Sequence, residues 1–279
     1  LATDAASGFG GALFLDNASR VSVVNSVFLS NRAHFGGAAY VGASAALTLH
    51  GTTTDSIFSS GLQLNANSST EDGGALYNAG GALAIDGALI TTNQTPTQTV
   101  LAGYGGAIFS SGVLTLTRSH LSQNQGRFGG ALFVGGEGAA RATLDHVTFK
   151  LNTAGSLGGG LYANSDTTNL TITNTLFYSN VSEGGGGGLA RFNAGLRVAD
   201  SAFVDNRAVS GGGLSLAAGP SPTSGPYVRL ENVTVSGNNA TGGQGGGVHN
   251  TGRTELYSVT IKDNAGGGTY TALGGNTRF

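Results

Sequence analysis

Residues 28–40 read Phe28-Leu29-Ser30-Asn31-Arg32-Ala33-His34-Phe35-Gly36-Gly37-Ala38-Ala39-Tyr40. The stretch joins an apolar-x-x-Asn motif to a glycine doublet that an apolar pair follows. The same apolar-x-x-Asn motif ends seven further segments, which close at Asn93, Asn124, Asn152, Asn180, Asn206, Asn238 and Asn264. Glycine doublets recur from Gly10 to Gly245 at a mean spacing of about 29 residues, and a period of this size indicates a repeat architecture.

The residues before each motif alternate between apolar and other side chains. In the copy that ends at Asn124, the apolar positions are Leu114, Leu116 and Leu121. A period of two is typical of β-strands, and neither helix caps nor 3.6-residue stripes are found. Each repeat holds three such strands. We therefore predict an all-β fold, a single-stranded right-handed parallel β-helix, which is a solenoid of about ten coils with three short strands each.

The recurring asparagine has a structural interpretation. A parallel coil must turn between strands, and the turn leaves backbone groups facing inward, where a missing partner is costly. An asparagine amide both donates and accepts, and asparagine tolerates left-handed backbone. The glycine doublets allow positive φ and close approach of stacked backbones. We expect a structural asparagine ladder made of Asn31, Asn93, Asn124, Asn152, Asn180, Asn206, Asn238 and Asn264.

Composition narrows the classes of protein. The chain has 279 residues with 50 Gly and no Cys, 10% of its residues are charged, and its net charge is −2. A nucleic-acid partner would need a basic stripe, so we expect none. We expect no transmembrane segment, because no apolar run approaches 18 residues. The start lacks the features of a signal peptide and is not Met. We expect residues 1–279 to be a single β-helix domain from a mature form or from a longer exported protein.

The paired motifs Gly-Gly-Ala-Leu/Ile and Phe-x-x-Asn resemble the repeats of the chlamydial polymorphic outer-membrane protein family. They are also similar to other bacterial right-handed β-helix surface proteins. The resemblance covers the chain from Gly10 to about Gly268. It implies an autotransporter passenger with a β-helix fold and an adhesive role. The chain departs from that family in lacking Cys and in changing to Gly-Gly-Gly-Leu after Gly158.

Three segments interrupt the period, and we expect each to be a loop insertion. They are 61–72, which follows a degenerate copy ending in Ser60, 94–104, and 216–227. All four prolines lie in the last two segments, and proline cannot donate to a strand ladder. Segments 61–72 and 94–104 leave the same corner of neighbouring coils and should lie side by side. Insertions on one face of a solenoid often form its binding face.

Candidate catalytic residues occupy one column of the repeat, three residues before the apolar residue that opens each apolar-x-x-Asn motif. Arg118, His146 and Asp200 lie there on nearby coils, and Asp145 precedes His146. Carboxylates beside a base are the residue types of general acid–base catalysis, and parallel β-helices also host enzymes of acidic polysaccharides. Polar residues are expected at a corner in any case. We therefore favour a protein that is not an enzyme and keep Asp145, His146, Asp200 and Arg118 as the candidates if it is one.

The remaining expectations concern ligands and partners. Calcium takes six to eight oxygens, and no dense carboxylate set occurs, so we expect no metal or cofactor and leave calcium open. The leading function is an extracellular structural or adhesive rod at the cell surface. Such a rod would present loops to a host or surface glycan or protein, or would self-associate through open coil ends. The alternative is a polysaccharide lyase or glycoside hydrolase that acts on an acidic glycan.

Overall fold

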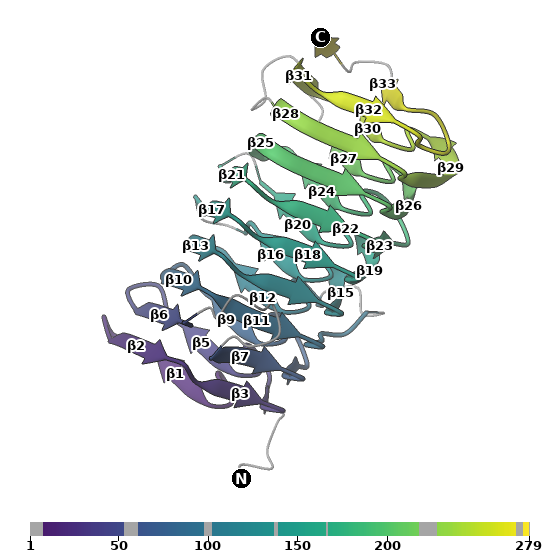
Figure 1. Ribbon diagram of the computed structural model, residues 1–279. Coiled ribbons are helices and arrows are strands. Elements are labelled where there is room, and N and C mark those ends of the chain that lie inside the picture. Colours follow the sequence, from purple (N-terminus) through teal and green to yellow (C-terminus); the bar gives the residue numbers. More distant parts are fainter. Residues whose placement is uncertain are drawn as a thin grey trace.

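The computed structural model describes residues 8–52, 61–97, 102–136, 139–165, 167–217, 228–271 and 276–278. Within these residues every regular element is a β-strand, and the strands pair in parallel. They stack into an elongated β-solenoid, with the first and last coils at opposite ends (Figure 1). None of the described residues forms a helix long and apolar enough to span a membrane.

The first sheet contains ten strands, each of which follows a glycine-rich turn. Its strands are β1 (Leu13–Leu15), β5 (Ala39–Val41), β9 (Leu76–Asn78), β12 (Ile108–Ser110), β16 (Leu132–Val134), β20 (Leu161–Asn164), β24 (Leu189–Phe192), β27 (Leu214–Ala217), β30 (Val248–Asn250) and β33 (Thr269–Thr271). Neighbours in this order are hydrogen-bonded, so each strand pairs with its equivalent in the next coil.

The second sheet has 17 strands in two runs, which the long strands β25 (Gly195–Val204) and β28 (Val228–Ser236) join. One run also contains β2 (Arg20–Val24), β6 (Ala46–His50), β10 (Ala82–Asp86), β13 (Val113–Thr117), β17 (Arg141–Asp145), β21 (Asn169–Thr173), β31 (Arg253–Tyr257) and β34 (Asn276–Arg278). The other contains β3 (Val27–Leu29), β7 (Leu62–Asn65), β11 (Ala88–Thr91), β14 (His120–Ser122), β18 (Thr148–Lys150), β22 (Leu176–Tyr178) and β32 (Thr260–Lys262).

The third side of the solenoid is made of two smaller sheets. The five-stranded one contains β15 (Gln125–Phe128), β19 (Thr153–Leu157), β23 (Val181–Ser182), β26 (Arg207–Ser210) and β29 (Asn239–Gln244). The two-stranded one pairs β4 (Arg32–Ala33) with β8 (Ser68–Ser69). Gln94 forms single bridges to Ser68 and to Gln125, so the two sheets continue into each other.

The core lies inside the solenoid, in columns of identical or similar side chains. Alternate residues of each strand point inward, as the period of two predicts. The rings of Phe149, Phe177 and Phe203 are fully buried and stack at centroid distances of 4.7 and 4.6 Å. Leu47 pairs in register with Leu83 in the neighbouring coil. Stacking like on like lets successive coils keep one register at a spacing of about 4.8 Å.

The recurring asparagines form a continuous hydrogen-bonded ladder inside one corner. The backbone N–H and Nδ2 of Asn124 both donate to Oδ1 of Asn152, at 3.0 Å each. The Nδ2 of Asn152 donates back to the carbonyl of Leu121 at 2.9 Å and onward to Oδ1 of Asn180. The same contacts repeat from Asn31 to Asn264. Each asparagine therefore satisfies backbone groups that the turn would leave buried and unpaired.

The left-handed backbone at this corner belongs to the residue before each ladder asparagine, not to the asparagine itself. Ser30, Thr92 and Leu151 have φ values of 55°, 55° and 56°. The expectation that asparagine was chosen for its tolerance of left-handed backbone is therefore wrong. Its side-chain amide is what the corner uses. At the next corner, Gly36 has a φ of 62°, and a Cβ there would lie 2.1 Å from the carbonyl oxygen of Ala39.

The expected loop insertion at 61–72 is wrong for most of its length. Strands β7 and β8 occupy this segment, and Asn67 is a regular member of the ladder between Asn31 and Asn93. Leu64 opens its apolar-x-x-Asn motif. Ser60, which we took as the degenerate ladder position, lies outside the described residues.

The other two expected insertions are described in part. In segment 94–104, Gln94 still pairs with the neighbouring coils, and residues 98–101 lie outside the described residues. In segment 216–227, Leu216 and Ala217 belong to β27, which shortens the expected loop at its start. Residues 218–227 lie outside the described residues.

Replacing a central ladder residue should destabilise the protein more than replacing the last one. Asn152→Ala removes the acceptor of two buried donors and the donor to the carbonyl of Leu121. We expect a loss of about 3 kcal/mol in the free energy of unfolding, since each buried unsatisfied group costs roughly 1–3 kcal/mol. The matched control is Asn264→Ala at the half-buried end of the ladder. Urea denaturation measures both, and equal losses would contradict a cooperative ladder.

Candidate functional site

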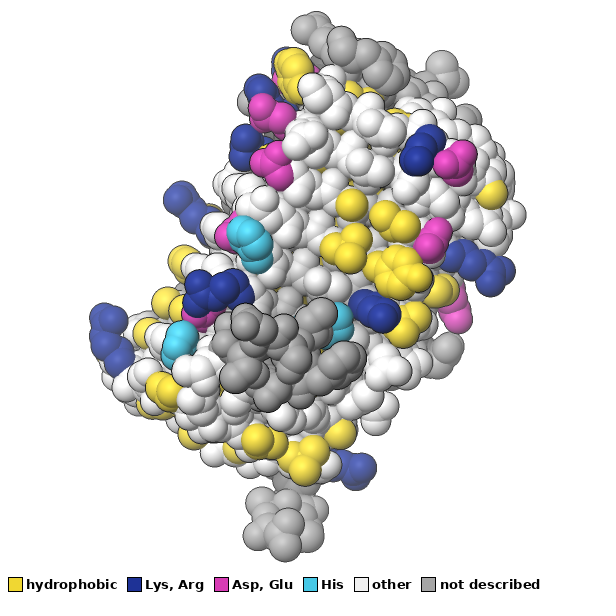
Figure 2. Space-filling view, viewed as in Figure 1, with side chains coloured by type: hydrophobic (Ala, Val, Ile, Leu, Met, Phe, Trp, Pro, Cys, Tyr) yellow, Lys and Arg dark blue, Asp and Glu magenta, His cyan; other side chains and the backbone are white. Residues whose placement is uncertain are grey.

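The corner column that holds the candidate catalytic residues runs along the bend between the two runs of the second sheet. Charged and histidine side chains gather along this bend, beside β10, β13, β17 and β28 (Figure 2). Arg118, His146 and Asp200 have left-handed φ values of 45°, 54° and 49°. They follow or interrupt β13, β17 and β25, so the structure places them in the column that the sequence predicts.

Each acid of this corner is held by its own neighbours. Asp145 accepts hydrogen bonds from Thr173 Oγ1 at 2.7 Å and Asn174 Nδ2 at 2.8 Å, and its other oxygen lies 2.8 Å from Nδ1 of His146. Arg118 instead pairs with Asp86 of the preceding coil. Asp200 accepts from Asn232 Nδ2 at 2.7 Å. Asp145 and His146 therefore contact each other, whereas Arg118 and Asp200 form separate surface contacts, and the four candidates do not converge on one point.

The electrostatics of this corner disfavour acid–base catalysis. The hydrogen bonds from Asn174 and Thr173, followed by that from His146, lower the pKa of Asp145 to about 2. A carboxyl with so low a pKa is ionised at neutral pH and cannot act as a general acid. Asp145 and Asp200 also lie two coils apart, about 10 Å along the solenoid axis. Among the described residues, no group of three His, Asp or Glu side chains could hold a metal ion.

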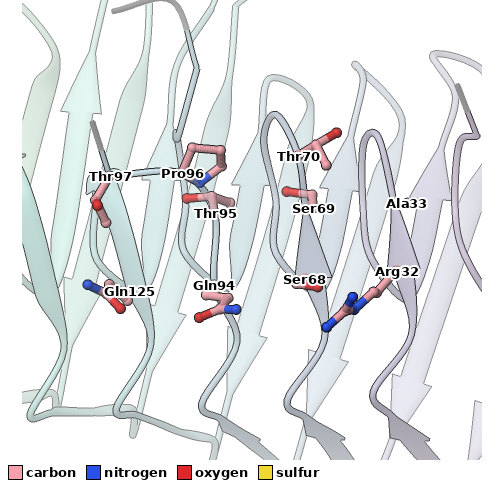
Figure 3. Close-up of a pocket in the computed structure, with 10 residues that line it drawn as sticks. All are labelled: Arg32, Ala33, Ser68, Ser69, Thr70, Gln94, Thr95, Pro96, Thr97 and Gln125. Atoms are coloured by element: carbon pink, nitrogen blue, oxygen red, sulfur yellow. The ribbon is translucent and has the colours of Figure 1, made fainter. Parts of the chain in front are cut away.

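A polar groove lies on the third side of the solenoid, next to the start of the asparagine ladder (Figure 3). Segments 61–72 and 94–104 both contribute to it, since Ser68–Thr70 and Gln94–Thr97 lie side by side there. Its lining consists of Arg32, Ala33, Ser68, Ser69, Thr70, Gln94, Thr95, Pro96, Thr97 and Gln125. We call this surface the polar groove.

The position after each ladder asparagine supplies the floor of the polar groove. Because the asparagine points inward, the next residue points outward. Arg32, Ser68, Gln94 and Gln125 hold this position on successive coils and pair in register with one another. They lie in a row in Figure 3. Adjacent members of the row are therefore about 4.8 Å apart.

The four floor side chains have no hydrogen-bond partner within the described chain. Outward amides elsewhere do: Nδ2 of Asn65 donates to Oε1 of Gln63 at 2.8 Å, and its Oδ1 accepts from Thr91 at 2.7 Å. The floor thus presents guanidinium, hydroxyl and amide groups whose hydrogen-bonding capacity is open to a ligand. The search for acid and base residues missed them. Their signal in the sequence is their fixed place after the ladder asparagine.

Two hydroxyls buried beneath the floor also lack partners. Ser69 and Thr95 follow the floor residues Ser68 and Gln94, and their side chains are 7% and 6% exposed. Neither Ser69 Oγ nor Thr95 Oγ1 makes a hydrogen bond. They are two of the five buried side-chain atoms without a partner in the described part of the chain. A buried polar group without a partner costs free energy, so this corner of the coil is less well satisfied than the ladder beside it.

The wall of the polar groove depends on two close backbone contacts. Gly103 has a φ of 97°, and a Cβ on it would lie 2.0 Å from the carbonyl oxygen of Pro96. A Cβ on Gly155 would lie 2.8 Å from the carbonyl oxygen of Thr97. The segment from Pro96 to Thr97 therefore leaves its own coil and leans over the coils that follow. It closes one side of the polar groove along the solenoid axis.

A half-buried carboxylate anchors the end of this wall segment. Oδ1 of Asp72 accepts hydrogen bonds from the backbone N–H groups of Gly103 and Tyr104 at 3.0 and 2.9 Å. Burial raises the pKa of Asp72 to about 6, although these two hydrogen bonds oppose the rise. Glu71 lies at the rim, where its Oε1 is 3.9 Å from Nε2 of His34. The rim therefore carries acidic groups while the floor carries the cation Arg32.

Comparisons with protein-family models, with curated proteins and with solved structures each found no match to this chain. The geometry of the polar groove and of the acidic corner is therefore the basis on which we assign a function.

Removing the unpartnered hydroxyl of Thr95 should stabilise the protein. Thr95→Val keeps the shape of the side chain and should raise the free energy of unfolding by about 1 kcal/mol, because a buried hydroxyl without a partner is unfavourable. Thr168→Val is the matched control, since the buried Thr168 Oγ1 donates to the carbonyl of Asn164 at 2.9 Å and its loss should destabilise. Thermal melting measures both. A lower melting temperature for Thr95→Val would show that its hydroxyl is satisfied.

Asp72 should make stability fall as the pH rises. Its pKa in the folded protein, about 6, lies above the ordinary value of 3.8, so the folded state holds the proton to higher pH than the unfolded state does. Between about pH 4 and pH 6 the folded state binds more protons, so this group contributes a loss of roughly 2 kcal/mol over that range. Asp72→Asn keeps an acceptor for both N–H groups and should lack this loss. Denaturation at several pH values tests it, and parallel curves for both proteins would contradict the burial argument.

Proposed function

We propose that the chain is a right-handed parallel β-helix of about ten coils that works outside the cell as an adhesive rod. The polar groove carries this proposal, because it is a concave surface with an unpaired polar floor beside segment 94–104, which interrupts the repeat. Interrupted repeats on one face of a solenoid often bind partners. The resemblance to bacterial surface repeats supports a position on the cell surface or in the medium. The partner is a host or surface glycan or protein.

The competing function, cleavage of an acidic polysaccharide, has less support. Cleavage of a glycosidic bond by paired carboxylates needs two acids that flank one bond. Asp145 and Asp200 are each held by neighbouring side chains and lie on coils that are not adjacent. The depression beside Asp200 is lined by Asn174, Ser201 and Asn232 and contains no second acid from the described residues.

The adhesive function is tested by binding to arrays of immobilised glycans and surface proteins. Replacing Gln94 and Gln125 together by Ala should reduce binding at least about tenfold, because the floor loses two groups that each contribute about 1 kcal/mol. The matched control replaces Thr115 and Thr143, which are exposed on a different side of the solenoid. Equal binding by both double variants would place the partner elsewhere.

A reducing-end assay on the glycans that bind separates adhesion from cleavage. An adhesive rod leaves the bound glycan intact, with or without calcium. Release of new ends that is lost on replacing Asp145 and Asp200 would instead support the enzyme.

A further inference from the structure

We infer that the polar groove binds one extended, uncharged polysaccharide chain laid along the solenoid axis, with one sugar facing each coil. The inference rests on the proposed function, and it adds the ligand class, the direction of the chain and the number of subsites. The observation behind it is the row of unpaired floor side chains, which repeats once for each coil.

The spacing of the floor matches a sugar chain. Arg32, Ser68, Gln94 and Gln125 follow one another at the strand separation of about 4.8 Å. One sugar of an extended β-1,4-linked chain has a similar length, so successive sugars would meet successive floor side chains, with alternate sugars turned over about the chain axis. A folded protein loop has no such repeat. The row therefore works as a set of four successive subsites, one for each coil.

The chemistry of the floor suits sugar hydroxyls. Ser68 offers a hydroxyl, and Gln94 and Gln125 each offer an acceptor oxygen and an N–H₂ group with two donors. A sugar hydroxyl also donates and accepts, so it can pair with either a donor or an acceptor of the floor. After Gln125 the same column continues with Thr153, which does not line the polar groove, and then with Val181, which is apolar. The floor of the polar groove therefore ends at Gln125.

The wall sets the direction of the chain. The backbone from Pro96 to Thr97 leans over the following coils and reaches the neighbourhood of Gly155. A ligand that lies along the axis runs beside this wall and meets every floor side chain. A ligand laid across the coils would contact one floor residue and collide with the wall. The axial direction is the one in which the whole row is used.

The charges around the polar groove favour an uncharged chain. Arg32 is the one cation among the lining residues, and it lies at one end of the row. Glu71 and Asp72 lie next to the lining residue Thr70, and Nε2 of His34 is 3.9 Å from Glu71. An acidic polysaccharide would place a charge on every sugar opposite the neutral side chains Ser68, Gln94 and Gln125. Those charges would lose water without gaining an opposite charge.

Titration calorimetry with oligosaccharides of one to six sugars tests the inference. The uncharged probes are cello-oligosaccharides and N-acetylated chito-oligosaccharides, and oligogalacturonates are the acidic probes for comparison. We expect affinity to rise about fivefold to tenfold with each added sugar up to four and then to level off, since each subsite adds about one net hydrogen bond. Gln94→Ala should lower the affinity for the tetrasaccharide by a similar factor, and Thr115→Ala should leave it unchanged. Added salt should have little effect.

The outcomes separate this inference from the proposed function. If a monosaccharide and a tetrasaccharide bind with equal affinity, and Gln94→Ala still lowers it, the inference of a sugar chain along the axis is overturned. The adhesive role would remain intact. Tighter, salt-sensitive binding of oligogalacturonates would overturn the uncharged class. Binding of an array protein at the polar groove, with no oligosaccharide bound, would overturn the glycan and keep adhesion. Failure of every array ligand and every oligosaccharide to bind would overturn both. Since the Gln94 side chain has no partner among the described residues, Gln94→Ala should keep the melting temperature of the parent, which verifies folding.

Discussion

The asparagine ladder is the interaction on which the rest of the structure depends. A parallel solenoid must turn its backbone inside each corner, and the turn buries N–H and C=O groups that neighbouring strands do not reach. Asn152 and its equivalents pair these groups with the coils on both sides. The ladder thereby fixes where each coil turns, and that position decides which later residues point inward and which point outward. The row that forms the floor of the polar groove is a direct consequence.

Residues whose side chains point into the solenoid could be predicted from the sequence, because each coil places the same packing and hydrogen-bonding requirement on them. The eight expected ladder positions and the glycine doublets come from this constraint. Asn67 was missed although Leu64 stands three residues before it as the motif requires. The preceding stretch contains Ile57-Phe58-Ser59-Ser60, which imitates the motif, and the true copy was then read as a loop. Sequence alone does not tell which of two closely spaced copies pairs with the neighbouring coils, because that choice depends on hydrogen bonds between coils.

The sequence places outward-pointing residues in columns, but it does not predict their hydrogen-bond and ion-pair partners. The column of Arg118, His146 and Asp200 follows from the repeat, yet the partner of Arg118 is Asp86 of the preceding coil. On a solenoid surface each side chain has neighbours on two adjacent coils as well as on its own strand, and side-chain length decides among them. The polar groove was hidden for the same reason. Its floor residues do not resemble a catalytic set, and what distinguishes them is that they share a row and have no hydrogen-bond partner in the part of the chain that the structure describes.

Unfavourable features lie around the polar groove, although buried atoms of Ser19, Asn78 and Arg229 elsewhere in the described chain also lack hydrogen-bond partners. Ser69 and Thr95 bury hydroxyls without partners, and Asp72 keeps a carboxylate where burial opposes its ionisation. A few coils away, the amides of Asn180 and Asn206 are hydrogen-bonded within the ladder, and the rings of Phe177 and Phe203 stack. A solenoid tolerates such a region because each coil is stabilised mainly by its immediate neighbours, so a local cost does not spread. Polar groups that lower stability without a structural role are common at binding sites. Here they lie beside the one row of open hydrogen-bonding groups that we identify along the described coils.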